Sequence, residues 1–232
     1  MAESTRDIKR RIRGISNTKQ ITKAMELVSS AKLRKAREKL DRTKPYFNTV
    51  YESINEILAA TENIKHPYLE AREVKKSLYV VVTADRGLAG GYNSNIIRLV
   101  ENEIRDNSDN ALLIVIGSKG RDYFVRRGYN VVNEFVGISE EPCFSDAREI
   151  GEKVMKLYED KEVDEVKLAY TKFITTISQD AVLMKLLPND NIKGEKTNKL
   201  SVVEYEPSPE DVLSYLIPKY IESTIYGALI ES

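Results

Sequence analysis

The sequence predicts an α/β protein: long N- and C-terminal helices forming an antiparallel left-handed coiled coil, and a Rossmann-like domain with a mostly parallel sheet. Three observations lead to this fold. A strongly basic N-terminal stretch contains no proline before Pro45. Short apolar runs alternate with amphipathic segments between residues 66 and 206. Residues 207–232 return to a helical period.

The N-terminal stretch is predicted to form one helix from about Ser4 to Asn63. Ser4 can cap the first turn. The pattern ends at His66-Pro67, because the residue before a proline is disfavoured in a helix. About 60 residues give a length of roughly 90 Å at 1.5 Å per residue. The helix is therefore longer than a globular domain is wide.

Two rows of positions, each repeating every seven residues, are mainly apolar along this helix. Ten of their sixteen members are apolar, and a 3.5-residue period is typical of a left-handed coiled coil. The first row is Ile8, Ile15, Thr22, Ser29, Ala36, Thr43, Val50 and Ile57, and the second is Ile12, Lys19, Glu26, Leu33, Leu40, Phe47, Ile54 and Thr61. An irregular amphipathic helix with a few exposed apolar residues is the alternative.

Four of the six polar members of these rows, Lys19, Thr22, Glu26 and Ser29, fall together in one segment. In the same segment, Ile21, Met25 and Val28 form an apolar stripe on a different side of the helix. We therefore expect this segment to face two partners. The first 44 residues carry 14 Lys or Arg against 5 Asp or Glu, a net charge of +9, although the whole chain is neutral. This charge favours an acidic partner.

The middle of the chain is predicted to alternate strands and helices, which implies right-handed crossovers and a sheet covered on both faces. The last strand is a candidate edge strand. The predicted strands are residues 77–83, 111–116, 130–136, 163–174 and 176–187, and the predicted helices are residues 93–105, 118–128 and 145–158.

The C-terminal segment starts a second long helix, with Ser208 as its cap and Pro209 at its first position. This helix is the natural mate of the first. Its 24 or so residues cover roughly 36 Å, so the far end of the first helix is expected to lack a mate within this chain. The predicted domains are residues 1–65, 66–206 and 207–232.

The composition argues against several kinds of catalytic and metal site. The chain has one cysteine, Cys143, and one histidine, His66, so neither a Cys/His metal cluster nor a Cys/His catalytic pair is expected. Cys143 is interpreted as a small packed side chain. The apolar runs are too short to span a bilayer, and the basic N-terminus lacks the apolar core of a signal peptide. We expect a soluble or peripheral cytosolic protein.

Residues 83–93 read TADRGLAGGYN and join a predicted strand to a predicted helix, the usual place for a phosphate-binding loop. The spacing of Gly87, Gly90 and Gly91 matches neither the dinucleotide nor the P-loop motif. A tight turn that brings Asp85 and Arg86 to the surface explains the glycines as well. A nucleotide-binding α/β enzyme and a nucleic-acid-binding coiled-coil protein remain alternative functions.

Three segments resemble a known family. Residues 19–36 read KQITKAMELVSSAKLRKA, residues 85–90 read DRGLAG, and residues 222–229 read ESTIYGAL. Together they resemble the gamma subunit of F-type ATP synthases of the bacterial type. The family often has Ser where Ala84 stands and Cys where Ala89 stands. Its members also continue past the equivalent of Ser232, so this chain is expected to lack the C-terminal part of the family's last helix.

The resemblance implies a non-catalytic rotor shaft that couples ion-driven rotation of the c-ring to conformational change at the catalytic beta subunits. The implied partners are the alpha and beta subunits, the epsilon subunit and the c-ring. No cofactor and no nucleic acid are implied. The implied location is the cytoplasmic side of the cell membrane, with membrane contact only through the complex.

The resemblance also implies site residues. Lys19, Lys23 and Arg86 match family positions that approach the acidic C-terminal loop of beta, and Met25 is expected to be a neighbouring side chain that must stay uncharged. Tyr205 and Glu206 match the foot, where epsilon and the c-ring are contacted; an ordinary loop before a helix is the alternative.

Overall fold

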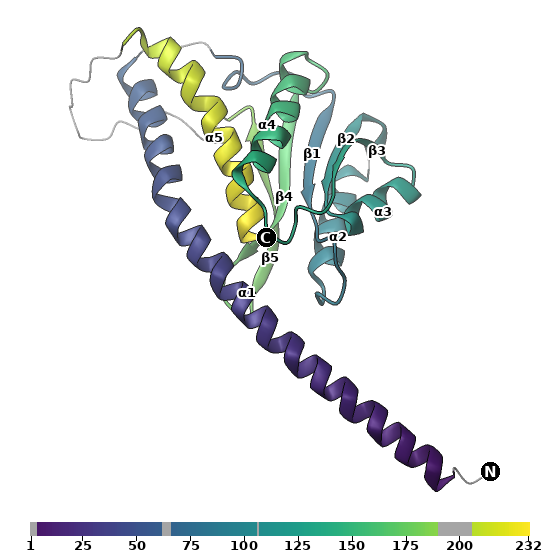
Figure 1. Ribbon diagram of the computed structural model, residues 1–232. Helices are drawn as coiled ribbons and strands as arrows, with labels where there is room; N and C mark the ends of the chain where they lie inside the picture. Colours follow the sequence, from purple (N-terminus) through teal and green to yellow (C-terminus); the bar gives the residue numbers. More distant parts are fainter. Residues whose placement is uncertain (1–3, 62–65, 106, 190–205) are drawn as a thin grey trace. The chain divides into compact units, whose positions relative to one another are not determined.

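The computed structural model describes residues 4–61, 66–105, 107–189 and 206–232. The chain divides into two compact units, unit 1 (Met1–Arg42) and unit 2 (Thr43–Ser232). The long N-terminal helix belongs to both, and the sheet with its covering helices belongs to unit 2. Figure 1 labels these elements.

The predicted helices and strands are confirmed, with most ends shifted by up to three residues. The helices are α1 (Thr5–Ala60), α2 (Tyr92–Ile104), α3 (Ser118–Arg126), α4 (Phe144–Glu159) and α5 (Pro209–Glu231), with a short 3-10 turn, η1 (Ser108–Asn110). The strands are β1 (Ser77–Val82), β2 (Ala111–Ile116), β3 (Asn130–Phe135), β4 (Glu165–Phe173) and β5 (Gln179–Leu187).

The five strands form one sheet in the order β3-β2-β1-β4-β5. β1 pairs in parallel with β2 and β4, and β2 pairs in parallel with β3. β5 is the antiparallel edge strand beside β4. Every residue of β1 and of β2 is buried, which agrees with their continuous apolar runs, because parallel strands are covered on both faces. The prediction of a mostly parallel sheet is confirmed.

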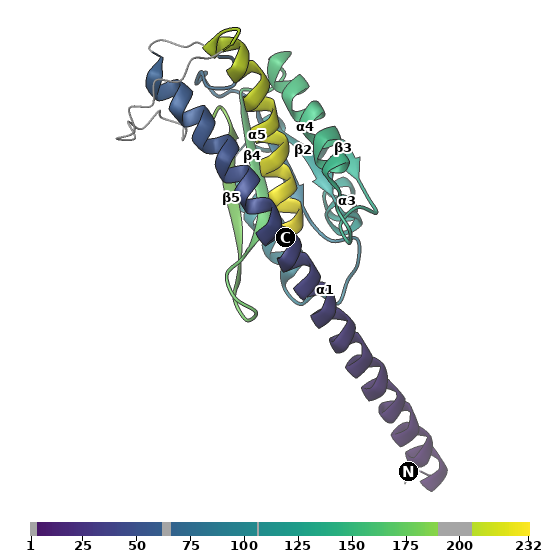
Figure 2. The same ribbon diagram turned by 60° about the vertical axis from the view of Figure 1, so that its left-hand side comes forward.

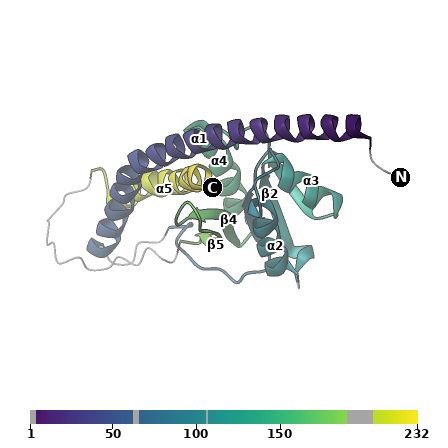
Figure 3. The same cartoon turned by 90° about the horizontal axis from the view of Figure 1, so that it is seen from below.

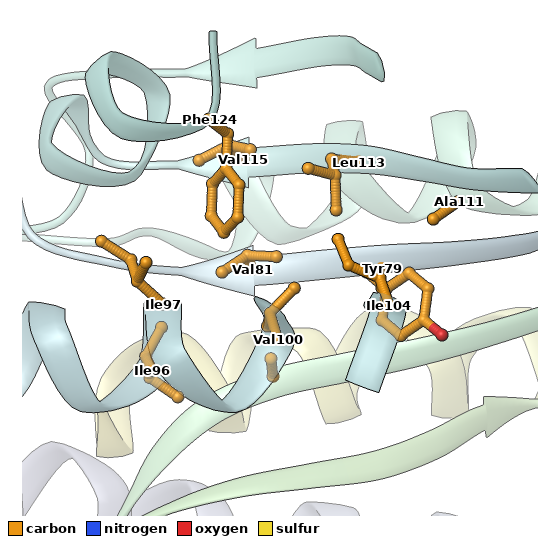
Figure 4. Packing of buried hydrophobic residues seen from close by; sticks show 11 residues of the cluster. Tyr79, Val81, Ile96, Ile97, Val100, Ile104, Ala111, Leu113, Val115 and Phe124 are labelled. Atoms are coloured by element: carbon orange, nitrogen blue, oxygen red, sulfur yellow. The ribbon is translucent and has the colours of Figure 1, made fainter. Parts of the chain in front are cut away.

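Helices cover both faces of the sheet. α2 packs on β1, β4 and β5 and α3 on β2 and β3, while α4 and α5 pack against each other and on β4. Figure 3 shows β4 and β5 between α5 and α2. Figure 4 shows part of the core on the α2 side. This cluster contains Tyr79, Val81, Leu113 and Val115 of the sheet with Ile96, Val100, Ile104 and Phe124 of the helices.

The last turns of α1 lie along α5 within unit 2, as Figure 2 shows. The Tyr51 and Tyr220 ring centroids are 5.8 Å apart. A Cβ added at Gly227 would lie 3.1 Å from the Phe47 ring. Because residue numbers rise on α1 where they fall on α5, the two helices are antiparallel, as predicted. The left-handed sense of their crossing stays a prediction.

The first part of α1, in unit 1, presents its side chains to solvent. Arg6 N donates to Ser4 Oγ at 3.3 Å, so the predicted cap is formed. Residues 4–35 are exposed throughout, including the predicted seam positions Ile12 and Ile15. Buried side chains of α1 occur only nearer its end, at Val50, Ile54 and Ile57. These three belong to the predicted heptad rows.

The interpretation of Cys143 as a packed side chain is wrong, because this cysteine is exposed. It stands at the N-cap of α4, where its N–H donates to the Asp146 carboxylate at 2.8 Å. The neighbouring Pro142 is the buried residue of this segment. The side chain of a residue at a helix cap faces outward from the first helical turn. The apolar neighbours of Cys143 in sequence gave no indication that it occupies a cap.

Asp85 connects three loops at the carboxyl ends of the parallel strands. One carboxylate oxygen accepts from Ser118 N at 2.9 Å, at the start of α3. The other accepts from Gly137 N at 2.9 Å and from Ser139 Oγ at 2.7 Å, in the loop after β3. Partial burial raises the pKa of the Asp85 carboxyl, but the hydrogen bonds from Ser139, Gly137 and Ser118 outweigh it and hold the pKa below its ordinary value.

Gly117 allows the start of α3 to pass close to the end of β1. Its φ is +88°, and an added Cβ would lie 2.2 Å from the carbonyl oxygen of Thr83. The approach is fixed by Thr83 itself, whose hydroxyl donates to Ile116 O at 2.7 Å and accepts from Gly120 N at 2.9 Å. The edge of the sheet that carries Asp85 is therefore tightly built.

We predict that Gly117→Ala lowers the free energy of unfolding by about 3–5 kcal/mol, because backbone strain adds to a steric overlap. Gly128→Ala is the matched control: its φ is +76°, with nothing within 4 Å of an added Cβ. Strain alone should cost about 1–2 kcal/mol there. Urea denaturation measures both variants, and equal losses would contradict the close approach at Thr83.

We predict that Asp85→Asn lowers the free energy of unfolding by about 1–3 kcal/mol at neutral pH, because several hydrogen bonds to a charged group are weakened. The folded pKa of Asp85 is lowered, so its stabilising contribution is present above the ordinary value of 3.8 and is lost as pH falls through the folded pKa. The difference in free energy of unfolding between wild type and variant, measured by urea denaturation, should therefore shrink as pH is lowered into the acid range. Asp180→Asn, at an exposed position of β5, is the control. If the difference in free energy of unfolding between wild type and Asp85→Asn did not change with pH, stabilisation by the charged Asp85 carboxylate would be excluded.

Candidate functional site

Two of the predicted site residues lie on one face of α1 in unit 1. Lys19 and Lys23 are both exposed and are four residues apart, so they are neighbours on the helix surface. The Lys23 ammonium lies 3.0 Å from the Glu26 carboxylate, and both side chains are 64% exposed. An exposed pair of this kind contributes little to stability. Both lysines are therefore accessible to an acidic partner.

Met25 lies on another side of the same helix, about 200° around the axis from Lys23 at 3.6 residues per turn. It is 48% exposed, and Ile21 and Val28 are exposed with it. The spacing of these three residues places them in one stripe. The basic face and the apolar stripe of unit 1 are therefore both accessible.

Arg86 belongs to unit 2, in the turn that follows β1. Its side chain is 80% exposed, and its Nε lies 2.5 Å from a carboxylate oxygen of Glu140. Leu88, two residues later, has a φ of +62° and is 93% exposed. The Asp85 network holds the base of this turn. The turn thus presents a cation and an apolar side chain from a fixed backbone.

The predicted foot residues stand before α5. Glu206 is exposed. Tyr205 lies outside the described residues. Ser208 caps α5 as predicted, because its Oγ accepts from Asp211 N at 3.1 Å. Glu206 is thus separated by one residue from Ser208, the N-cap of α5.

The structure also identifies two residues that sequence reasoning missed, Ser139 and Glu140. The Ser139 hydroxyl accepts from Asp85 N at 2.9 Å and donates to the Asp85 carboxylate, while Glu140 pairs with Arg86. A sequence signal for this contact exists. Asp85 follows the first predicted strand and Ser139 the third, and the carboxyl ends of parallel strands meet at one edge of a sheet.

The geometry of this edge disfavours a phosphate ligand. The start of α3 and the amides of Gly137 and Ser139 form a cradle of donors, and such a cradle suits an anion. The Asp85 carboxylate already occupies it. The anion at this edge is therefore supplied by the chain itself.

The crevice between β1 and β4, where the strand order reverses, is the usual ligand site of such sheets. The end of α5 reaches it. Ser232 Oγ lies 2.7 Å from Tyr92 Oη at the start of α2, and it accepts from Thr171 N of β4 at 3.2 Å. Polar groups that could orient a ligand are here bonded to one another.

Other kinds of site are also not observed in the described part of the chain. It contains no group of three or more His, Cys, Asp or Glu side chains placed to hold a metal ion. An open cleft of about 670 Å³, lined by Glu101, Arg105, Arg127 and Tyr129 among others, lies at the amino ends of β2 and β3. Ligands of α/β sheets bind at the opposite edge. Over residues 4–61, 66–105, 107–189 and 206–232, no helix combines the length and apolarity needed to cross a membrane.

Comparison with known proteins gives consistent matches over the whole chain. A family model described as ATP synthase matches residues 4–232. The ATP synthase gamma chain of Alkaliphilus metalliredigens is 53% identical over 237 aligned residues, which cover 100% of this chain and 82% of the relative. The sodium-ion-specific ATP synthase gamma chain of Acetobacterium woodii is 46% identical, with coverages of 100% and 82%.

Solved structures agree with the sequence matches. A chain in the central stalk and c-ring of the Tetrahymena thermophila mitochondrial ATP synthase superposes with a TM-score of 0.69 at 26% identity. The match covers 91% of this chain and 92% of that one. The alignment thus includes both the sheet and the long helices. Because the family model and close relatives both span essentially its whole length, the chain belongs to the ATP synthase gamma chain family.

Proposed function

We propose that this chain is a non-catalytic rotor subunit of an ATP synthase, which couples ion-driven rotation of a c-ring to conformational change at catalytic beta subunits. The observation that carries the proposal is the 53% identity to a gamma chain over the whole chain. The similarity to a central-stalk chain at a TM-score of 0.69 supports it. The proposed domains are residues 1–65 and 207–232 for the shaft and 66–206 for the foot.

A shaft can act without catalysing any bond change itself. A ligand shifts an equilibrium between conformations only through a difference in its affinity for them. An asymmetric rotor that contacts three beta subunits unequally favours a different conformation at each, and turning it exchanges these preferences. The exposed basic face and the exposed apolar stripe of α1 supply two unlike sides, which is the asymmetry that this mechanism needs.

We assign Lys19, Lys23 and Arg86 as electrostatic contacts to an acidic C-terminal loop of beta. All three are exposed, and the net charge of +9 over the first 44 residues attracts an acidic surface. Exposed cations contribute more to specificity and association rate than to affinity. Such contacts suit a subunit that must exchange partners as it turns.

The foot is assigned a different set of partners from the shaft. Tyr205 and Glu206 are proposed to contact the epsilon subunit and the c-ring, and the alpha and beta subunits are proposed to surround the shaft. Membrane contact is proposed only through the complex, on the cytoplasmic side. The exposure of Glu206 before a capped helix is consistent with a partner contact.

A nucleotide-binding enzyme and a nucleic-acid-binding protein are less favoured. The Asp85 carboxylate fills the anion cradle at the carboxyl edge, and Ser232 bonds to Tyr92 and Thr171 at the reversal point of the strand order. The basic residues of α1 lie along an extended helix with exposed apolar neighbours, an arrangement that suits protein contacts.

The chain is predicted to co-purify with alpha and beta subunits, and a full-length version mixed with them is predicted to restore ATP hydrolysis. Lys19→Gln with Lys23→Gln should weaken assembly most at low salt, because screening already reduces such contacts at high salt. Arg148→Gln with Lys153→Gln, two exposed positions on α4, is the control.

Saturable ATP binding by the isolated chain would support the nucleotide-binding enzyme. Salt-sensitive DNA binding would support the nucleic-acid-binding function.

Met25→Lys is predicted to impair coupling, because a cation beside the acidic loop of beta adds an ion pair that must be broken at each step. Met25→Leu should leave coupling intact, since it keeps an uncharged side chain of similar volume. Proton pumping per ATP hydrolysed, measured in the assembled membrane complex, compares the two. Unchanged pumping efficiency in Met25→Lys would refute the role of Met25.

A further inference from the structure

The loop after β1 and the loop after β3 are joined by contacts between consecutive residues. Asp85 exchanges two hydrogen bonds with the Ser139 side chain, at 2.9 Å and 2.7 Å. The next residue of each loop continues the contact, because Arg86 Nε lies 2.5 Å from Glu140 Oε1. Two consecutive residues of one loop therefore contact two consecutive residues of the other.

The Arg86–Glu140 pair differs from an ordinary surface ion pair in its support. Most exposed pairs are weak because two long side chains must be ordered to form them. Here the backbones of both residues are already fixed by their neighbours, through the Asp85 carboxylate and the amides of Gly137 and Ser139. Such preorganisation gives the Glu140 carboxylate a high effective concentration at the guanidinium.

The pair is nevertheless open to competition. The Arg86 side chain is 80% exposed and that of Glu140 is 36% exposed. A guanidinium offers five N–H donors in a planar fork that matches a carboxylate. A second carboxylate approaching from solvent can therefore take the place of Glu140, and Glu140 can take it back.

We propose that Glu140 is an intramolecular competitor for Arg86, which an acidic segment of a head subunit must displace when it contacts this turn. The proposal rests on the proposed function for the identity of the partner. Glu140 sets how tightly the turn holds that partner, and it is a positioning residue of the contact.

The exchange has a consequence for rotation. If Arg86 passed from a partner's carboxylate to solvent at each step, the full strength of the ion pair would oppose departure. With Glu140 beside it, one carboxylate replaces another, and the guanidinium stays paired throughout. The difference in free energy between the contact and non-contact positions is then small, and the turn does not arrest the shaft.

The test is a double-mutant cycle in the full chain, with wild type, Glu140→Gln, Arg86→Gln and the double variant. The measurement is the dissociation constant of each chain for the hexamer of alpha and beta subunits, at about 0.1 M salt. Glu140→Gln should bind about two- to fivefold more tightly than wild type, as expected for the loss of a competing surface pair. The same substitution in the Arg86→Gln background should have no effect.

Glu141→Gln is the matched control, because it removes the same charge from the next residue of the loop. Equal effects of Glu140→Gln and Glu141→Gln, or an effect of Glu140→Gln that persists without Arg86, would overturn the competitor role. An unchanged urea midpoint would show that the variant folds, since the Asp85–Ser139 contacts remain. Wild-type chain that fails to bind the hexamer would instead count against the proposed function.

Discussion

The carboxylate of Asp85 is the interaction on which the carboxyl edge of the sheet in unit 2 depends. It fixes the turn after β1, the start of α3 and the loop after β3 with one partly buried charge. In many α/β proteins the same place holds the phosphate of a ligand that binds reversibly, and the loops are shaped by that ligand. Here the chain supplies the anion permanently. The three loops of this edge are therefore held together without a ligand.

An edge held in this way is useful only if it is well connected to the helices of its own unit. α5 provides this connection, because it packs on α4 and β4 and also lies beside the last turns of α1. Gly151 and Gly227 allow close approach: an added Cβ would lie 3.3 Å from the Glu222 side chain and 3.1 Å from the Phe47 ring. Close packing has low compressibility, so forces pass between these elements with little loss of position.

Local sequence was sufficient for most of the fold. β2 was predicted to the residue because a continuous apolar run is bounded by Asn110 and Gly117. The start of β5 was placed too early, because Thr175 forms a local turn by accepting from Ile177 N and Ser178 N. The Arg86–Glu140 contact joins residues 54 positions apart in sequence. No local pattern encodes such a pairing, although strand topology indicated which loops would meet.

The reversal of β5 sets the polarity of α5. β5 runs back along β4, with Leu187 opposite Val166, so the chain returns to the amino edge of the sheet. α5 then runs toward the other edge, and Ser232, the residue that follows the helix, contacts Thr171 near the carboxyl end of β4. One antiparallel strand thus aims the C-terminal end of α5 at the edge that bears Asp85.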